Sequence, residues 1–184
     1  MESSLTPKQK GLVRELNDIC AETRMDYWNI AKYPKGTRTG MLELQKRQAI
    51  VGEIITQYTL IDEGLNEEIC KYFFSSSKSS IQLWRTKKFQ DFNYYILERL
   101  YLLEKLRLFQ SFYEVPNNVR KNIEKLDALR NAVAHAFFPE NLKDYKRWRK
   151  VVYKGKDIFT LEGVKLFRED MVSVNNFFLS RFKG

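Results

Sequence analysis

The chain contains a single histidine, His135, and any chemistry that needs an imidazole must use it. A zinc site built from several imidazoles is therefore excluded within one chain. An imidazole has an unperturbed pKa near ~6.5, so it can accept or donate a proton close to neutral pH. Arg130 and Asn131 precede His135 in the same short segment. They add a permanently charged guanidinium and a carboxamide to the groups available there.

The apolar spacing around these residues predicts a helix over about residues 119–137, which ends before Pro139. Its apolar side chains share one face, which we expect to pack on the core of the domain. The predicted core face consists of Ile123, Leu126, Leu129, Val133 and Phe137.

The opposite face of the same helix carries small and polar residues. Asn131 and His135 are one turn apart, and Ala128 and Ala132 lie beside them. A solvated face would normally carry lysine and glutamate, whereas alanines let a second backbone come close. We expect this face to be covered, either by another helix of the chain or by a second copy of the protein. Arg130 falls near the edge of the core face, and its long side chain can reach around the helix.

Further helices are expected to position this one. A capping Thr6 followed by Pro7 predicts a first helix that ends before residues 34–36, and periodic apolar residues predict a second over about residues 41–74. A third, mostly buried, is expected over about residues 89–113. Thr160 is expected to cap a last helix. The apolar face of that helix consists of Val164, Phe167, Met171, Val174 and Phe178.

These elements predict an all-α fold, a bundle of four to five core helices with a small β-hairpin near residues 148–160. Residues 1–40 are expected to form an N-terminal helical extension, and residues 41–184 the main domain. No secretory signal and no membrane-spanning run of apolar residues is visible, so we expect a soluble, cytoplasmic protein without a membrane partner. Cys20 and Cys70 lack metal-ligand spacing and are expected to be reduced cysteines.

The net charge is +9 and the pI is about 9.5. Such an excess of positive charge attracts polyanions, and nucleic acid is the first candidate. Several of the basic residues directly follow the helix that carries His135, and we expect these residues to bind RNA phosphates. The residues concerned are Lys143, Lys146, Arg147, Arg149, Lys150 and Lys154. Tyr145, Trp148 and Tyr153 are interleaved with them; we favour a core role for these rings, with base stacking as the alternative.

The sequence resembles the HEPN domain family. Arg130 and His135 match its Arg-x4–6-His motif, with Asn131 directly after the arginine. The stretch from Ile61 to Phe74 resembles an early core helix of the family, and residues 158–163 with the helix after them resemble the tail of several bacterial members. The resemblance covers roughly residues 45–183 and implies a HEPN-like helical bundle.

The resemblance also implies a function, that of a metal-independent endoribonuclease without cofactor. Its site lies where two motif helices meet across a homodimer. The imidazoles of two copies of His135 would act as base and acid, Arg130 would hold the attacked phosphate, and Asn131 would orient the phosphate or the histidine. Cleavage of single-stranded RNA would then leave a 2′,3′-cyclic phosphate and a 5′-hydroxyl. Small bacterial members of the family further imply a toxin or defence effector, with an antitoxin or another protein as partner.

Two other functions stay open. The chain can be a non-catalytic module that binds RNA, a nucleotide or a protein, or it can be a subunit of a larger complex that uses the alanine-lined face. The motif itself has an alternative interpretation, in which Arg130 is structural and His135 complements the dipole at the end of its helix. Other chemistries lack their motifs, because the chain has neither a Walker phosphate loop nor a nucleophile elbow.

Overall fold

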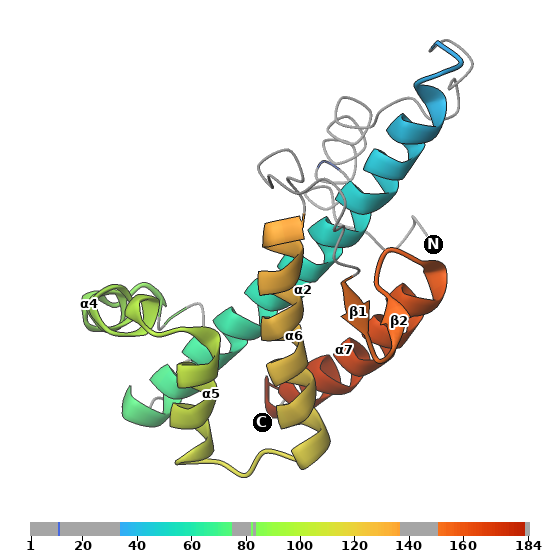
Figure 1. Ribbon diagram of the computed structural model, residues 1–184. Coiled ribbons are helices and arrows are strands. Elements are labelled where there is room, and N and C mark those ends of the chain that lie inside the picture. The colour runs from blue at the N-terminus through green and yellow to red at the C-terminus, as the bar shows by residue number, and fades with distance from the viewer. Residues whose placement is uncertain (1–10, 12–33, 75–81, 83, 137–150, 183–184) are drawn as a thin grey trace. The chain divides into compact units, whose positions relative to one another are not determined.

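The structure is a computed structural model that describes Gly11 and residues 34–74, 82, 84–136 and 151–182, with His135, Ala136 and Phe182 as backbone only. The chain divides into two units, residues 1–46 and 47–184. Five α-helices, one short 3-10 helix and a two-stranded sheet make up the described part, so the fold is all-α as predicted (Figure 1). The predicted first helix lies almost entirely outside the described residues.

In the first unit, the described chain begins with a turn at Pro34. The backbone amide and the hydroxyl of Thr37 both donate to the carbonyl of Pro34, at 3.0 and 2.9 Å. Helix α2 (Arg38–Phe74) begins directly after this turn and continues into the second unit. Its start lies slightly before the predicted one near residue 41.

In the second unit, α2 supplies one wall of the core. Ile54, Ile61, Leu65 and Ile69 are buried, and none of their exposed fractions is above 1%. These residues recur at the helical spacing that the sequence showed, so the prediction of a long amphipathic helix is confirmed.

The prediction of a single helix over residues 89–113 was wrong. The chain forms α4 (Lys87–Tyr95), a 3-10 turn (Leu97–Arg99) and α5 (Leu102–Gln110). Leu97 turns into the core and is fully buried, and Tyr101 then takes an extended conformation at the start of α5. Glu104 accepts a hydrogen bond from the Tyr101 amide at 2.8 Å, which stabilises the new helix start.

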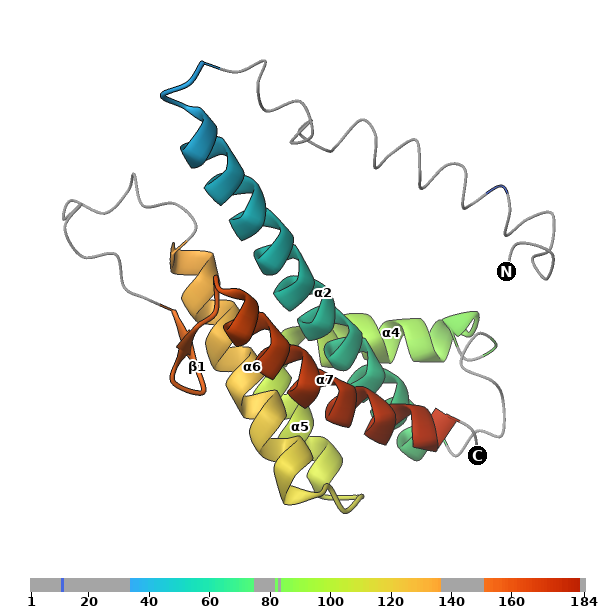
Figure 2. The ribbon, with the colours of Figure 1, turned by 90° about the vertical axis from the view of Figure 1, so that its right-hand side faces the viewer.

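Helices α6 (Asn117–Ala136) and α7 (Leu161–Phe182) lie side by side and run in opposite directions (Figure 2). The contacts between them show this direction, because Asn118 bonds to Ser173 while Lys125, further along α6, lies 3.9 Å from Asp170. The predicted apolar face of α7 is confirmed. Phe167, Met171, Val174 and Phe178 are buried, and Val164 is partly buried.

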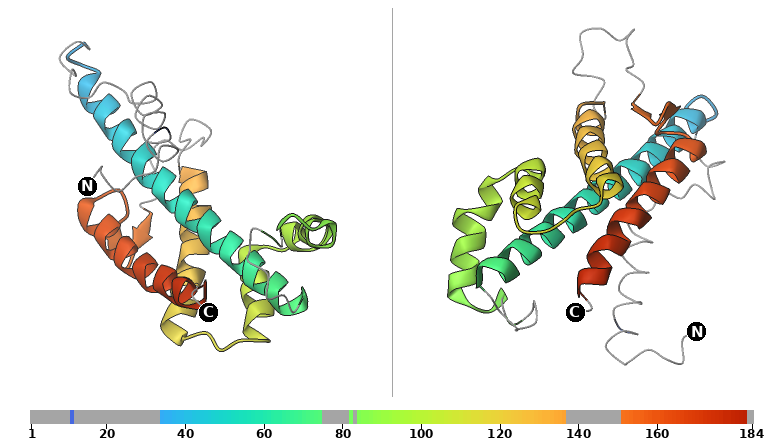
Figure 3. Two further views of the ribbon diagram at one scale, coloured as in Figure 1. Left: turned by 180° about the vertical axis from the view of Figure 1, so that it is seen from behind. Right: turned by 90° about the horizontal axis from the view of Figure 1, so that it is seen from below.

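Helix α7 also runs alongside α2, in the same direction (Figure 3). Asn175 donates to Gln57 at 3.0 Å, and Arg181 donates to Glu68 at 3.3 Å. Phe178 fits against Gly64 between these two polar contacts, since a β-carbon at Gly64 would lie 3.5 Å from the ring. Among the described helices, none is long and apolar enough to cross a membrane.

The predicted hairpin is present as strands β1 (Val152–Tyr153) and β2 (Lys156–Asp157), paired antiparallel. Lys154 and Gly155 form its turn with φ angles of 47° and 80°, the left-handed pair that a two-residue hairpin requires. The Thr160 hydroxyl accepts a hydrogen bond from the Gly163 amide at 3.2 Å, so the predicted cap of the last helix is confirmed.

Candidate functional site

The site predicted from the sequence lies on α6, whose two faces have opposite environments. The core face is confirmed, because Ile123, Leu126 and Val133 are fully buried at 0% and Leu129 is 4% exposed. Phe137 lies outside the described residues.

The back of α6 is open among the described residues. Ala128, Ala132 and Asn131 lie on it, and Asn131 and Ala132 are exposed, as are Arg130 and Ala134. No described helix of the chain covers this face, so the covering helix that we considered from the sequence is not found there. A second copy of the protein stays the other candidate.

Arg130 and Asn131 contact each other directly. The guanidinium of Arg130 donates from Nη1 to Oδ1 of Asn131 at 3.0 Å. Asn131 in turn donates from Nδ2 to Oδ2 of Asp127 at 3.4 Å, one turn earlier on α6. The three side chains therefore form one polar row along the exposed flank of the helix. Because its carboxamide contacts both neighbours, Asn131 orients the guanidinium with respect to the helix.

The guanidinium of Arg130 has a second support from α2. Its Cζ atom lies 5.2 Å from the centre of the Tyr58 ring, within the range of a cation–π contact. The guanidinium thus lies between a carboxamide on its own helix and a ring on the neighbouring helix. Such a fixed cation beside an exposed helix face is suited to hold a phosphate without a large reorganisation on binding.

Tyr58 also connects the site to the start of α5. Burial, followed by the charges of Asp127 and Asp62, raises the pKa of Tyr58, while Arg130 and the backbone of Leu102 lower it. The phenol is therefore neutral at physiological pH. One turn further along both helices, the buried Lys105 donates to both carboxylate oxygens of Asp62 at 2.8 and 2.7 Å. This pair holds α5 against α2 beside the site.

The carboxyl group of Asp127 has an altered acidity. Partial burial raises its pKa above the ordinary value, and the nearby Arg130 guanidinium opposes that shift. When it is ionised, Asp127 offsets part of the charge of Arg130, and its carboxylate accepts the hydrogen bond from Asn131.

His135 is in the last turn of α6, one turn after Asn131, as the sequence predicted. Its side chain lies outside what the structure describes. The structure thus brings Arg130 and Asn131 into contact and places the backbone of His135 on the same helix end.

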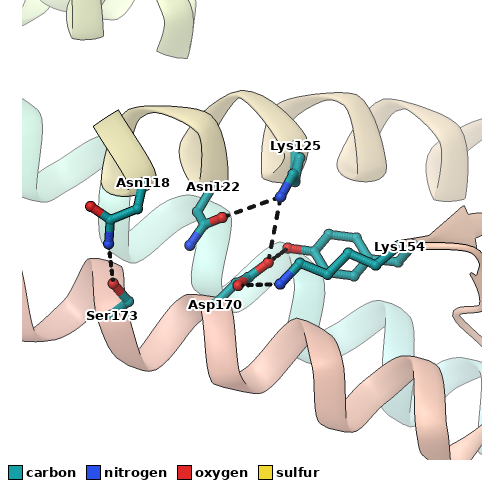
Figure 4. Close-up of polar contacts among 7 residues, drawn as sticks. Asn118, Asn122, Lys125, Lys154, Asp170 and Ser173 are labelled. Carbon is teal, nitrogen blue, oxygen red and sulfur yellow. Dashed lines mark hydrogen bonds and ion pairs between the residues drawn. The ribbon is translucent and has the colours of Figure 1, made fainter. Parts of the chain in front are cut away.

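The basic stretch after α6 is described at one position only. Lys154 donates to Asp170 at 2.6 Å, so a carboxylate already offsets its charge (Figure 4). Tyr153 is 3% exposed and donates to the other oxygen of Asp170 at 2.7 Å, which confirms the core role expected for this ring. The other predicted RNA-binding residues lie outside the described ranges: Lys143, Lys146, Arg147, Arg149 and Lys150.

Two residues of the site were missed by sequence reasoning. Asp127 precedes Asn131 by one helical turn, a spacing that the sequence shows and that predicts a contact. Tyr58 is far away in the sequence and follows the apolar periodicity of α2, so no local signal distinguishes it from a core residue. Its contact with Arg130 arises only when α2 and α6 pack together.

Within residues 34–74, 82, 84–136 and 151–182, no group of three or more histidine, cysteine or acidic side chains is placed to hold a metal ion. Comparison of the chain with protein-family models, characterised proteins and solved structures finds no significant match. The HEPN resemblance therefore stays a prediction from the sequence.

Proposed function

We propose that the chain is a metal-independent endoribonuclease that cleaves single-stranded RNA at a composite site, formed where two copies of α6 meet in a homodimer. The observation that carries the proposal is the fixed guanidinium of Arg130, held by Tyr58 and Asn131 beside an open, alanine-lined helix face. Alanines at Ala128 and Ala132 allow a second helix backbone to approach this face closely.

The chemistry that we propose uses these groups in named roles. One copy of His135 takes the proton from the 2′-hydroxyl, whose oxygen attacks the adjacent phosphorus, and the partner's His135 gives a proton to the departing 5′-oxygen. Arg130 stabilises the charge that gathers on the phosphate during this attack. The products are a 2′,3′-cyclic phosphate and a 5′-hydroxyl. A chain of this kind would act as a toxin or defence effector under the control of an antitoxin or another partner protein.

The test is cleavage of an end-labelled single-stranded RNA in EDTA. Removal of a fixed charge donor or of a general acid–base typically costs on the order of 10²-fold or more in rate. We therefore expect Arg130→Ala and His135→Ala to lose cleavage by about that factor. Arg120→Ala is the matched control, because Arg120 is also on α6 but bonds to Glu124 and Asn117, away from the site.

The dimer has its own test. Ala132→Arg places a long charged side chain on the open face, and we expect it to lower both the mass in solution and the cleavage rate. A wild-type chain that is monomeric at micromolar concentration and still cleaves RNA would contradict the composite site. A wild-type dimer that leaves RNA intact would contradict the catalytic role proposed for Arg130 and His135.

A second function is favoured by Asp127. Its carboxylate lies next to Asn131 and offsets part of the charge that a catalytic arginine would present to a phosphate. A non-catalytic RNA-binding or protein-interaction module would tolerate this arrangement. In that case RNA affinity, measured by gel shift beside the cleavage assay, would be unchanged in His135→Ala.

A further inference from the structure

Three tyrosines, two at the end of α4 and one at the start of α5, are strongly exposed. The exposed fractions are 78% for Tyr101, 63% for Tyr95 and 59% for Tyr94, the largest among the tyrosines that the structure describes. Figure 1 shows the chain leading from α4 to the beginning of α5. By contrast, Tyr153 is almost completely buried. Large rings exposed to this extent leave flat apolar surface in water and are available to a ligand.

Tyr101 is next to the candidate site. It directly precedes Leu102, whose backbone interacts with the Tyr58 hydroxyl, and the ring of Tyr58 lies under the guanidinium of Arg130. The bond of Lys105 to Asp62, at 2.7 Å, fixes this end of α5 against α2. The backbone of Tyr101 is therefore near Arg130 in the fold, a placement suited to neighbouring groups of one nucleic-acid strand.

One exposed cation lies close to Tyr101 in the sequence. Arg99 is exposed two positions earlier, and within the described part of the chain no carboxylate is paired with it. The acidic neighbour Glu104 already accepts the Tyr101 amide at 2.8 Å, and Glu98 accepts from Asn93 at 3.2 Å. Both carboxylates keep their charge, so the guanidinium of Arg99 is the group of this stretch that would bind a phosphate beside Tyr101.

We infer that Tyr101 is a stacking subsite for an unpaired base of the RNA strand whose phosphate is held at Arg130. This inference rests on the proposed function and specifies its substrate: the strand must be unpaired beside the cleaved bond, because a ring can stack only on a base that has left its helix. The hydroxyl of Tyr101 is not needed for stacking, whereas its aromatic face is.

The test is fluorescence anisotropy in EDTA with a labelled 2′-O-methyl RNA oligonucleotide, which cannot be cleaved because the attacking hydroxyl is blocked. Loss of one base–aromatic stack should weaken binding by about 5- to 150-fold. We expect this loss in Tyr101→Ala and Tyr101→Leu, and near wild-type affinity in Tyr101→Phe and Tyr101→Trp. Leu161→Ala, a change at another strongly exposed apolar residue, is the matched control.

The outcomes separate this inference from the proposed function. Wild-type affinity in both Tyr101→Ala and Tyr101→Leu would overturn the stacking subsite, even if cleavage still depends on Arg130. Equal loss in Tyr101→Leu and Tyr101→Phe would also overturn it, because the aromatic face would then be irrelevant. Binding that depends on the ring, in a protein that never cleaves RNA, would support the subsite and contradict only the catalytic role.

Discussion

Asp170 holds the hairpin against α6 and α7, and its removal should destabilise the protein by an amount that the contacts predict. Its carboxylate accepts from the Tyr153 hydroxyl at 2.7 Å and from Lys154 at 2.6 Å. In Asp170→Ala the buried phenol loses its acceptor, which costs about 1–3 kcal/mol. The ion pair with the part-exposed Lys154 is screened by solvent and adds at most about 1 kcal/mol. We expect a total loss of about 1–4 kcal/mol, or roughly 2–16 °C in Tm for a chain of this size.

The measurement is urea and thermal unfolding followed by circular dichroism, with Tyr153→Phe and the double variant completing a mutant cycle. If the hydroxyl and the carboxylate interact as described, Asp170→Ala costs less in the Tyr153→Phe background, by about 0.5 kcal/mol or more. Strict additivity, together with a loss below about 0.5 kcal/mol for Asp170→Ala alone, would refute the assignment of this contact.

The same carboxylate predicts a pH dependence. Burial alone would raise the pKa of Asp170, but the hydrogen bonds from Lys154 and Tyr153 and the charges of Lys154 and Lys125 lower it below its ordinary value. The unfolded chain, with an aspartate pKa near ~3.9, therefore binds the proton more readily than the folded chain. The stabilisation from Asp170 is present above that pH and is lost as the pH falls through the lowered folded pKa. The stability gap between wild type and Asp170→Ala should shrink over the same range.

Three other substitutions or reactions test separate parts of the structure. Gly163→Ala should destabilise the protein by more than ~1 kcal/mol in urea unfolding, because the added β-carbon would collide with the carbonyl of Asp157; an unchanged midpoint would contradict the close approach. Burial, aided by the charge of Glu67, raises the pKa of Cys70 to about 12, so this thiol should react with Ellman's reagent only on unfolding, in a variant whose other cysteine is serine; rapid reaction of the folded protein would argue against its burial. Tyr58→Leu should lower the RNA cleavage rate about 2- to 5-fold by removing the ring under Arg130, whereas Tyr58→Phe should stay close to wild type; equal rates in all three proteins would argue against a positioning role.

The periodic parts of the fold were predictable from the sequence. The buried face of α6, the apolar face of α7 and the capping Thr160 all follow from local patterns that the structure confirms. The hairpin was predicted because Gly155 allows the left-handed turn that two short strands need.

The break between α4 and α5 was not predictable in the same way. Ile96 and Leu97 are residues that a helix tolerates, and no proline or glycine marks the change of direction. The break follows from tertiary packing, because Leu97 turns into the core and Asn93 bonds to Glu98 across the turn. The role of Tyr58 was hidden for the same reason, since its partner Arg130 is on a helix far away in sequence.

The homodimer that we propose at the open alanine face beside Arg130 would make activity depend on the abundance of the protein. A site completed only by a second copy makes reactivity depend on how many chains are present. Far below the dissociation constant of the dimer, paired chains increase with the square of the total, so halving the supply removes roughly three quarters of the completed sites. Far above the dissociation constant, the number of completed sites rises in proportion to the total number of chains. The rate of synthesis would then itself regulate the activity, without any dedicated ligand.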